Sequence, residues 1–300
     1  MGVLEGKVAV ITGSGRGLGL AIAQAYAREG AAVVLASRSS AALQEAAEAL
    51  ERQGARASWQ VTDVGDLEQV KALAYHAVKM FGKIDIWVNN AGYGGVYGPT
   101  AAIDPEDFER VTRTNIFGEY YGSWVAIQHF LVQGTGGKLI NLLGRGDTTP
   151  VPLQNAYASS KAWVRNFTLA LAKEYKKKGI GIYALNPGLV DTDLLRKVSV
   201  VGGYEKKLRV FSTIIRMWAN PPSVPAEKAV WLASAATDGK TGLEVRVLTP
   251  GKQLAGLLRE LRRLVLLQPP RDTSIKLKII APSKPEETRP TRDGYQPVDY

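Results

Sequence analysis

Lys7-Val-Ala-Val-Ile-Thr12-Gly-Ser-Gly-Arg-Gly-Leu-Gly19 is the stretch that decides the fold. Its first six residues form the short apolar run of a buried strand, and the glycines after it allow a tight turn. Apolar positions with helical spacing follow and end at Glu29-Gly30, and Ala32-Val-Val-Leu-Ala36 predicts a second strand. In a strand–glycine turn–helix unit the backbone can approach a pyrophosphate, which the helix N-terminus faces. The stretch therefore predicts a dinucleotide-binding β-α-β unit.

The same alternation of strands and helices continues along most of the chain. We expect helix 40–52, strand 56–61, helix 66–81, strand 84–89, strand 138–144, a helix through residues 157–178, strand 181–185, helix 225–236 and strand 243–248. Such alternation predicts a doubly wound α/β fold, with helices on both faces of a parallel sheet. Residues 193–224 form a long, partly helical insertion, and segments of this length are often lids.

Composition restricts the class of protein. With 300 residues and 45% hydrophobic content the chain can bury a large core, and it contains no apolar stretch long enough to span a membrane. It also lacks a secretory signal, so we expect a soluble cytosolic protein. Zero cysteines exclude disulfides and thiolate metal sites, and we expect both histidines to lie within ordinary helices. The net charge of +10 is scattered along the sequence, which favours a phosphorylated small molecule over nucleic acid.

The end of the second strand indicates which dinucleotide is bound. An acidic residue there would bind the ribose hydroxyls of the adenosine and repel a 2′-phosphate. The sequence instead reads Ser37-Arg38, and Arg16 lies within the glycine turn. Both guanidinium groups could form charge-assisted hydrogen bonds to a 2′-phosphate, although Arg38 could also simply begin the next helix. We favour NADP(H) over NAD(H).

Tyr157 and Lys161 lie four residues apart, one turn from each other on the same face of a predicted helix. A free tyrosine titrates near pH ~10, which is too high for proton exchange at neutral pH. An adjacent cation favours the phenolate, so we expect the pKa of Tyr157 to be lowered.

Four motifs together resemble the classical short-chain dehydrogenases/reductases in their order and spacing. They are Thr12-Gly-Ser-Gly-Arg-Gly-Leu-Gly19, Asn89-Asn-Ala-Gly92, Tyr157-x-x-x-Lys161 and Asn186-Pro-Gly188, and the resemblance covers about residues 5–251. It implies one sheet of seven parallel strands. It also implies that Tyr157 is the general acid/base, that Lys161 binds the nicotinamide ribose, and that Asn115 holds a water in a proton relay.

The glycine turn, the strand ends and the resemblance together predict the cofactor-binding residues. They are Gly13, Ser14, Arg16, Gly17, Leu18, Gly19, Ser37, Arg38, Asp63, Val64, Asn90, Ala91, Gly92, Tyr157, Lys161, Pro187, Gly188, Val190 and Thr192. Asp63 is placed to meet the adenine amino group, or equally to cap the next helix. In the family, the backbone at Val190 and the hydroxyl of Thr192 lie near the nicotinamide carboxamide. For Asp191 and Asp193 we favour helix capping.

One position departs from the family pattern. Thirteen residues before Tyr157, where the family has a substrate-binding serine, this chain has Gly144. A hydroxyl or charge could reach the pocket from the residues that follow, which are Arg145, Asp147, Thr148 and Thr149. Losing one preorganised donor costs about 2.7–4 kcal/mol of the roughly 8–23 kcal/mol that enzymes supply, so activity can survive. One hypothesis is an NADPH-dependent enzyme that reduces the carbonyl group of a fairly apolar small molecule, or oxidises the corresponding alcohol. The second is an NADP(H)-binding regulatory or scaffold protein, and the third is a membrane-surface protein that uses its C-terminal helix.

The chain is expected to consist of a main domain, 1–251, and a C-terminal extension, 252–300. The insertion 193–224 within the main domain is rich in apolar residues, which suits either a bulky apolar substrate or a neighbouring subunit. In the extension we expect an amphipathic helix, 252–268, an edge strand, 273–280, and an extended proline-rich tail, 281–300. The leucine face of the helix could lie on a membrane surface, but we favour packing against the protein's own core or a partner subunit. Aromatic side chains also indicate a homo-oligomer, through Trp124, Trp163 and Phe167.

Overall fold

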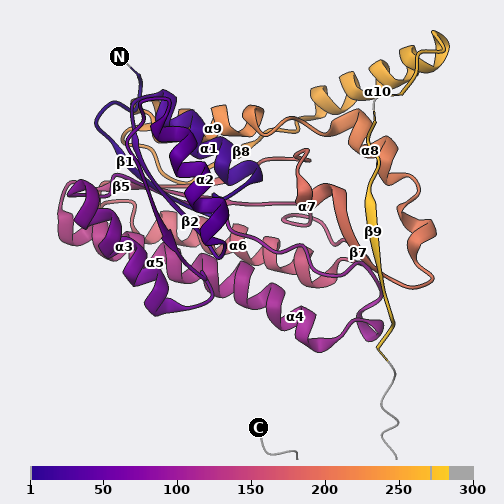
Figure 1. Ribbon diagram of the computed structural model, residues 1–300, viewed down its shortest axis with the longest axis horizontal. Coiled ribbons are helices and arrows are strands. Elements are labelled where there is room, and N and C mark those ends of the chain that lie inside the picture. Colours follow the sequence, from indigo (N-terminus) through magenta and orange to yellow (C-terminus); the bar gives the residue numbers. More distant parts are fainter. Residues whose placement is uncertain (1, 271, 284–300) are drawn as a thin grey trace, which may run out of the picture.

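The computed structural model describes residues 2–270 and 272–283. A sheet runs through the main body of the protein, with helices around it (Figure 1). It has seven strands in the order β3-β2-β1-β4-β5-β6-β8, and every pairing is parallel. The strands are β1 (Val8–Thr12), β2 (Ala32–Ser37), β3 (Ala57–Val61), β4 (Ile86–Asn89), β5 (Gly137–Leu142), β6 (Ile180–Asn186) and β8 (Leu243–Arg246). The strand order reverses between β1 and β4, which opens a crevice at their carboxyl ends. The predicted doubly wound fold is confirmed.

Helices cover both faces of the sheet, because the central strands are apolar on both sides. One core cluster joins the sheet to α1 (Gly17–Arg28), α2 (Ser40–Glu51) and α9 (Ser223–Ala233). The other joins it to α3 (Leu67–Phe81), α5 (Gly118–Gln133) and α6 (Asn155–Glu174). All five residues of β1 are buried. The central strands are therefore held from both sides, and the loops at their carboxyl ends have a rigid base.

A network of buried polar side chains fixes the position of α5 relative to β4 and β5. The Asn89 side chain accepts a hydrogen bond from the Trp87 indole at 2.8 Å and donates to Ser123 and Asn141, each at 3.1 Å. Helix α5 approaches this network closely at Gly122, where an added Cβ would overlap the side-chain Oδ1 atom of Asn89. Residues at the beginning of α5 are thereby positioned under the end of β4.

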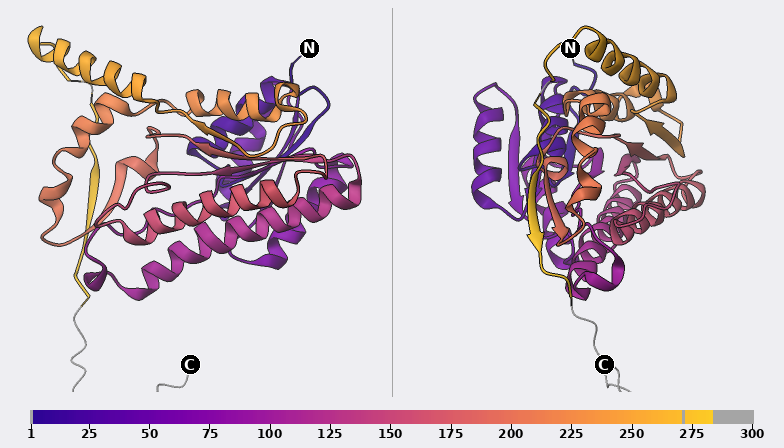
Figure 2. Two further views of the ribbon diagram at one scale, coloured as in Figure 1. Left: turned by 180° about the vertical axis from the view of Figure 1, so that it is seen from behind. Right: turned by 90° about the vertical axis from the view of Figure 1, so that its right-hand side faces the viewer.

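The insertion and the C-terminal extension form one assembly at the end of the molecule, most visible in the left view of Figure 2. The insertion contains α7 (Asp193–Arg196), β7 (Lys197–Val201), η3 (Glu205–Leu208) and α8 (Phe211–Trp218). The extension contributes α10 (Pro250–Val265) and β9 (Lys276–Ile280). Strands β7 and β9 pair in parallel as a separate two-stranded sheet, and α10 contacts α8. The insertion was expected to be only partly helical, so β7 is an addition, whereas the edge strand in the extension is present.

The remaining elements are connectors, namely η1 (Thr100–Ala102), α4 (Pro105–Thr112), the π-helical turn η2 (Arg113–Phe117) and η4 (Ala235–Thr237). The predicted tail is 281–300, and its residues from 284 onward lie outside the described residues. In the part of the chain that is described, no helix is long and apolar enough to cross a membrane. The histidines at 76 and 129 lie in α3 and α5 as expected.

One alternative for the extension is contradicted. The leucine side chains of α10 were expected to pack against the protein's own core or a partner subunit. Within this chain Leu254, Leu257, Leu258, Leu261 and Leu264 are all exposed, which excludes the protein's own core and leaves the partner subunit as a prediction. The residues of α10 that are buried are Gly256 and Glu260, on the opposite side of the helix. The helix therefore contacts the rest of the protein through its polar face.

The close approach of α5 to β4 predicts a loss of stability on Gly122→Ala. Alanine normally favours a helix over glycine, but here its methyl group would overlap the Asn89 amide. We expect a loss of about 1–3 kcal/mol in the free energy of unfolding, measured by urea denaturation. Gly251→Ala in α10 is the control, since an added Cβ there meets nothing within 4 Å. Equal midpoints for the two variants would contradict the packing argument.

Candidate active site

The glycine turn lies directly against the end of β4. The side-chain amide of Asn90 donates to the carbonyl oxygens of Thr12 and Gly13, at 2.9 and 3.2 Å. Gly13 has a φ of 65°, and a Cβ on it would overlap the Cα of Ala91. Only glycine allows this approach. The structure therefore brings together the two predicted motifs that follow β1 and β4.

The turn has the features that a dinucleotide needs. Helix α1 begins at Gly17, and its N-cap residue, Arg16, makes no side-chain capping bond, so the first-turn amides face outward from a positive helix end. A Cβ at Gly15 would lie only 3.0 Å from the Ser37 hydroxyl, so the backbone leaves a narrow cradle beside the end of β2. The N-terminus of α1 fits a pyrophosphate, and the space beside Gly15 and Ser37 fits an adenosine ribose.

The predicted adenosine contacts lie in the glycine turn and at the ends of β2 and β3, and they stay predictions. Arg38 is exposed at the end of β2, but Arg16 forms an ion pair with Asp193 of α7 at 3.6 Å. The Asp63 carboxylate accepts a hydrogen bond from the Gly65 amide at 2.9 Å, which closes the turn before α3. The N-cap of α3 is Asp66, so Asp63 does not cap that helix, and its contact with adenine stays a prediction. The other carboxylate oxygen of Asp63 makes no hydrogen bond to any described residue.

The turn after β6 meets the glycine turn from the other side. Its conformation is set by Gly188, with a φ of 69° and an amide that donates to the Asn186 side chain. A Cβ on Gly17 would lie 3.4 Å from the Thr192 methyl group, so the beginning of the insertion lies against the glycine turn. The predicted capping role for the two aspartates in this turn is wrong. Asp191 pairs with Arg196, and Asp193, the first residue of α7, pairs with Lys197 and Arg16.

The tyrosine–lysine pair lies on α6, beneath the carboxyl end of β5. The Lys161 ammonium is buried and donates to the Leu142 carbonyl at 2.7 Å. A Cβ on Gly144 would overlap the Tyr157 hydroxyl and lie 3.3 Å from the Lys161 side chain. The phenol thus fills the space in which a side chain at position 144 would begin, and this is the physical reason that only glycine fits there.

The predicted lowering of the Tyr157 pKa is contradicted. Burial, followed by the nearby Asp147 carboxylate, raises the pKa of Tyr157 to about 12. Burial also lowers the pKa of Lys161, although the carboxylates of Glu119 and Asp147 oppose that shift. The Lys161 ammonium is engaged by a backbone carbonyl, so desolvation of the phenol dominates. In this arrangement Tyr157 is protonated at neutral pH and can donate a proton.

Of the four candidates that follow Gly144, only Asp147 is buried. Its carboxylate accepts from the Asn186 amide at 2.9 Å and pairs with Arg246 at 2.9 Å. Arg246 also pairs with Glu244 on β8. Strands β6 and β8 therefore hold Asp147 in place beside the tyrosine–lysine pair, a fixed negative charge that sequence spacing left as one possibility among four.

Asn115 is fully enclosed in the π-helical turn η2. Its side chain accepts from the Tyr93 amide at 2.8 Å and donates to the Tyr93 carbonyl and to the Ser160 hydroxyl, each at 3.0 Å. These bonds join η2 to the loop after β4 and to α6. All of the hydrogen-bonding groups of the Asn115 amide are engaged within the protein, and its expected role in a water relay stays a prediction.

Glu119 is a site residue that sequence analysis missed. It is 2% exposed, and its Oε1 atom has no hydrogen-bond partner among the described residues. Burial raises the pKa of its carboxyl group, while the Lys161 ammonium opposes that shift. The signal in the sequence was a single carboxylate within the otherwise uncharged, largely apolar stretch 118–128. Within the described residues there is no group of three potential metal ligands.

Comparison with known proteins identifies the class. A family model for short chain dehydrogenases matches residues 7–200. The 3beta-hydroxysteroid dehydrogenase 1 of Eggerthella lenta is 36% identical over 256 residues, which cover 83% of this chain and 97% of that protein.

Two solved structures are similar throughout the main domain. The 3-ketoacyl-(acyl-carrier-protein) reductase of Brucella melitensis, complexed with NADH, has a TM-score of 0.73 and 32% identity, covering 83% of this chain and 99% of its own. A gluconate 5-dehydrogenase of Burkholderia cenocepacia, in complex with NADP and tartrate, has a TM-score of 0.72 and 29% identity, with coverage of 84% and 96%. These matches define an NAD(P)-dependent oxidoreductase that acts on a carbonyl or alcohol group. The chain belongs to the short-chain dehydrogenase family.

The buried carboxyl group of Glu119 predicts a pH-dependent stability. Its pKa is raised in the folded state above the ordinary value of 4.5, so the folded protein keeps a proton that the unfolded chain releases. The stability contributed by this group is therefore lost as the pH rises from 4.5, the ordinary pKa, to about 8, the pKa in the folded protein. We expect Glu119→Gln to gain in unfolding temperature relative to the unmodified protein between about pH 5 and pH 8. Parallel curves would contradict this, and Glu45→Gln, at an exposed position, is the control.

Proposed function

We propose that this protein is an NADP(H)-dependent oxidoreductase that reduces the carbonyl group of a fairly apolar small molecule, or oxidises the corresponding alcohol. The observation that carries the proposal is the half-buried Tyr157 phenol, which lies on α6 one turn from the buried Lys161 ammonium at the carboxyl end of β5. At neutral pH the phenol carries the proton that reduction of a carbonyl group consumes, although burial makes it a weaker acid than a free tyrosine.

Each residue of the site has a role in this proposal. The nicotinamide cofactor, when bound, exchanges a hydride with the substrate carbon. Tyr157 donates the Oη proton to the substrate oxygen, and Lys161 binds the nicotinamide ribose. Asp147, held by Arg246 and Asn186, keeps the phenol protonated through its negative charge. Asn115 supports the return of a proton by fixing η2 against α6.

The absence of a serine at position 144 makes the proposed active site simpler than that of the family. The substrate oxygen loses one preorganised donor, which costs about 2.7–4 kcal/mol in the transition state. This loss is smaller than the roughly 8–23 kcal/mol of a whole enzyme, so turnover is slowed rather than abolished. The alternative is an NADP(H)-binding regulatory protein, but the Asn115 side chain, retained together with Tyr157 and Lys161, has no evident use in mere binding.

The insertion 193–224 is proposed to cover the substrate. Leu194 approaches Gly94 in the loop after β4, where an added Cβ would lie 3.3 Å from its methyl carbon. Thr192 lies against the glycine turn, so the insertion begins over the cofactor cradle. An apolar side chain at this position favours an apolar substrate.

We also propose a homo-oligomer formed through α5 and α6. Several aromatic side chains gather on the outer sides of these helices. Trp163 stacks on Phe167 with ring centroids 4.6 Å apart, and Tyr120 lies 5.9 Å from Phe167. Trp124 and Tyr120 are also 40% and 43% exposed, so this surface can contact a second copy of the chain.

Tyr157→Phe tests the proposed chemistry. The variant lacks the proton donor, so turnover of a carbonyl compound should fall about 10²–10⁴-fold. The affinity for NADPH, measured by fluorescence titration, should change less than about threefold, because the phenyl ring keeps the shape of the site. Tyr75→Phe on the exposed side of α3 is the control. Unchanged turnover in Tyr157→Phe would exclude the mechanism. Tight NADPH binding without consumption by any carbonyl compound in the unmodified protein would favour the regulatory alternative.

Arg38→Ala tests the proposed cofactor preference. A hydrogen bond to a charged group contributes about 1.5–3 kcal/mol, so removing the guanidinium should weaken NADPH binding roughly tenfold or more. NADH has no 2′-phosphate, and its dissociation constant should not change. Arg28→Ala, at an exposed position at the end of α1, should affect neither cofactor. Equal losses for NADPH and NADH would argue against a phosphate contact.

A further inference from the structure

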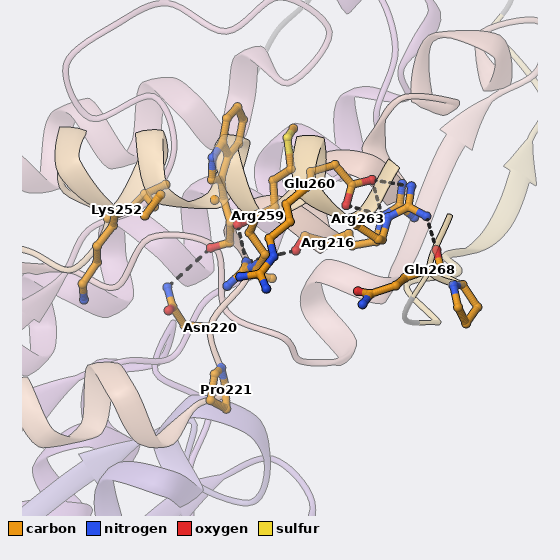
Figure 3. A pocket seen from close by; sticks show the side chains of 16 residues that line it. Arg216, Asn220, Pro221, Lys252, Arg259, Glu260, Arg263 and Gln268 are labelled. Carbon is orange, nitrogen blue, oxygen red and sulfur yellow. Dashed lines mark hydrogen bonds and ion pairs between the residues drawn. The ribbon is translucent and has the colours of Figure 1, made fainter. Parts of the chain in front are cut away.

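Helix α10 is joined to the protein by its polar face. The Glu260 carboxylate, 8% exposed, receives the guanidinium groups of Arg216 on α8 and Arg263, each at 2.9 Å (Figure 3). Arg259 donates to the Met217 carbonyl at 2.8 Å, and the Trp218 indole donates to the Gln253 carbonyl at 3.1 Å. These bonds span a pocket of about 780 Å³ between α8 and α10. They fix which side of α10 faces outward.

The outward face of α10 is a continuous apolar strip. Positions 254, 257, 258, 261, 264 and 265 recur at helical spacing, so they lie on one side of the helix. Each of these side chains is exposed, from 43% for Leu257 to 80% for Val265, and Leu267 just beyond the helix is 90% exposed. Residues opposite this strip make the polar contacts with α8. We call the strip and Leu267 the outer leucine face.

Positive charge is concentrated at the same end of the molecule. The sequence segments 193–218 and 250–280, which include α7, β7, α8, α10 and β9, contain thirteen lysines and arginines, one of them at the undescribed position 271, but only four aspartates and glutamates. They carry nearly all of the chain's net charge of +10. The single acidic residue of α10, Glu260, is buried between two arginines and is not presented outward. Figure 1 shows α8, α10, β7 and β9 gathered at this end.

An apolar helix face within a cationic region matches an anionic lipid surface. Stable attachment of a surface helix requires apolar burial together with attraction to charged headgroups, and both features occur here. A second copy of the chain is disfavoured as the occupant, because a symmetric contact would bring two strongly cationic ends together. We propose that the outer leucine face of α10 docks the protein on the surface of an anionic bilayer, parallel to the membrane plane.

Vesicle flotation tests this inference on the full chain. The probes are vesicles of phosphatidylcholine alone and of phosphatidylcholine with about 30% phosphatidylserine. We expect the protein to float with the anionic vesicles and about tenfold less with the neutral ones. Raising the salt concentration from about 0.1 to 0.5 M should weaken the interaction several-fold, because the charge contribution is screened.

The double variant Leu257→Glu/Leu264→Glu should lose at least about tenfold of the bound fraction. Both side chains are exposed and glutamate is a good helix former, so the fold should persist, which circular dichroism would check. The matched control is Tyr75→Glu/Val132→Glu, which places the same charges at exposed apolar positions of α3 and α5.

Two results would overturn the proposal. One is an equal bound fraction for the leucine variant and the unmodified protein, or no flotation of either. The other is a dimer by light scattering that becomes a monomer in the leucine variant while neither protein floats, since a second copy would then cover the helix. The test does not involve the cofactor or turnover, so its outcome is separate from that of the proposed oxidoreductase.

Discussion

The buried ammonium group of Lys161 is the constraint on which the site depends. A charge taken out of water must be compensated, and three elements contribute to its compensation. Strand β5 provides the Leu142 carbonyl at 2.7 Å, the loop after β5 provides the negative charge of Asp147, and α5 provides the Glu119 carboxyl group, whose own pKa is raised by burial. The same burial raises the pKa of Tyr157, so one desolvated pocket sets the protonation state of the whole site.

Much of this arrangement could be predicted from the sequence, because it depends on local chemistry. The glycines after β1 and the four-residue spacing of Tyr157 and Lys161 are local patterns, and the alternation of strands and helices determines a parallel sheet. The pKa of Tyr157 could not be predicted in this way. Spacing along the helix shows that the Lys161 cation is near Tyr157, which would lower the tyrosine pKa. Burial raises that pKa, and it dominates here because the ammonium is bonded to the Leu142 carbonyl. Glu119 was missed for the same reason, since its importance comes from what α6 places beside it.

The C-terminal extension shows a second limit of sequence reasoning. The period of α10 correctly indicates an amphipathic helix, but period alone does not say whether the apolar face meets protein or solvent. That choice is made by Arg216, which lies 44 residues before its partner Glu260. Likewise β7 finds its partner β9 only near the end of the described chain. Contacts between segments so distant in sequence leave no local pattern.

These distant contacts also connect the insertion to the extension. The insertion begins against the glycine turn at Thr192, continues through β7, which pairs with β9, and ends with α8, which is bonded to α10. The Thr273 hydroxyl donates to the Ser212 carbonyl at 2.9 Å, which adds a further connection. A lid that opened as a free loop would break all of these bonds together. The insertion and the extension are therefore expected to move as one unit, so a surface that binds α10 also restrains the segment next to the cofactor cradle.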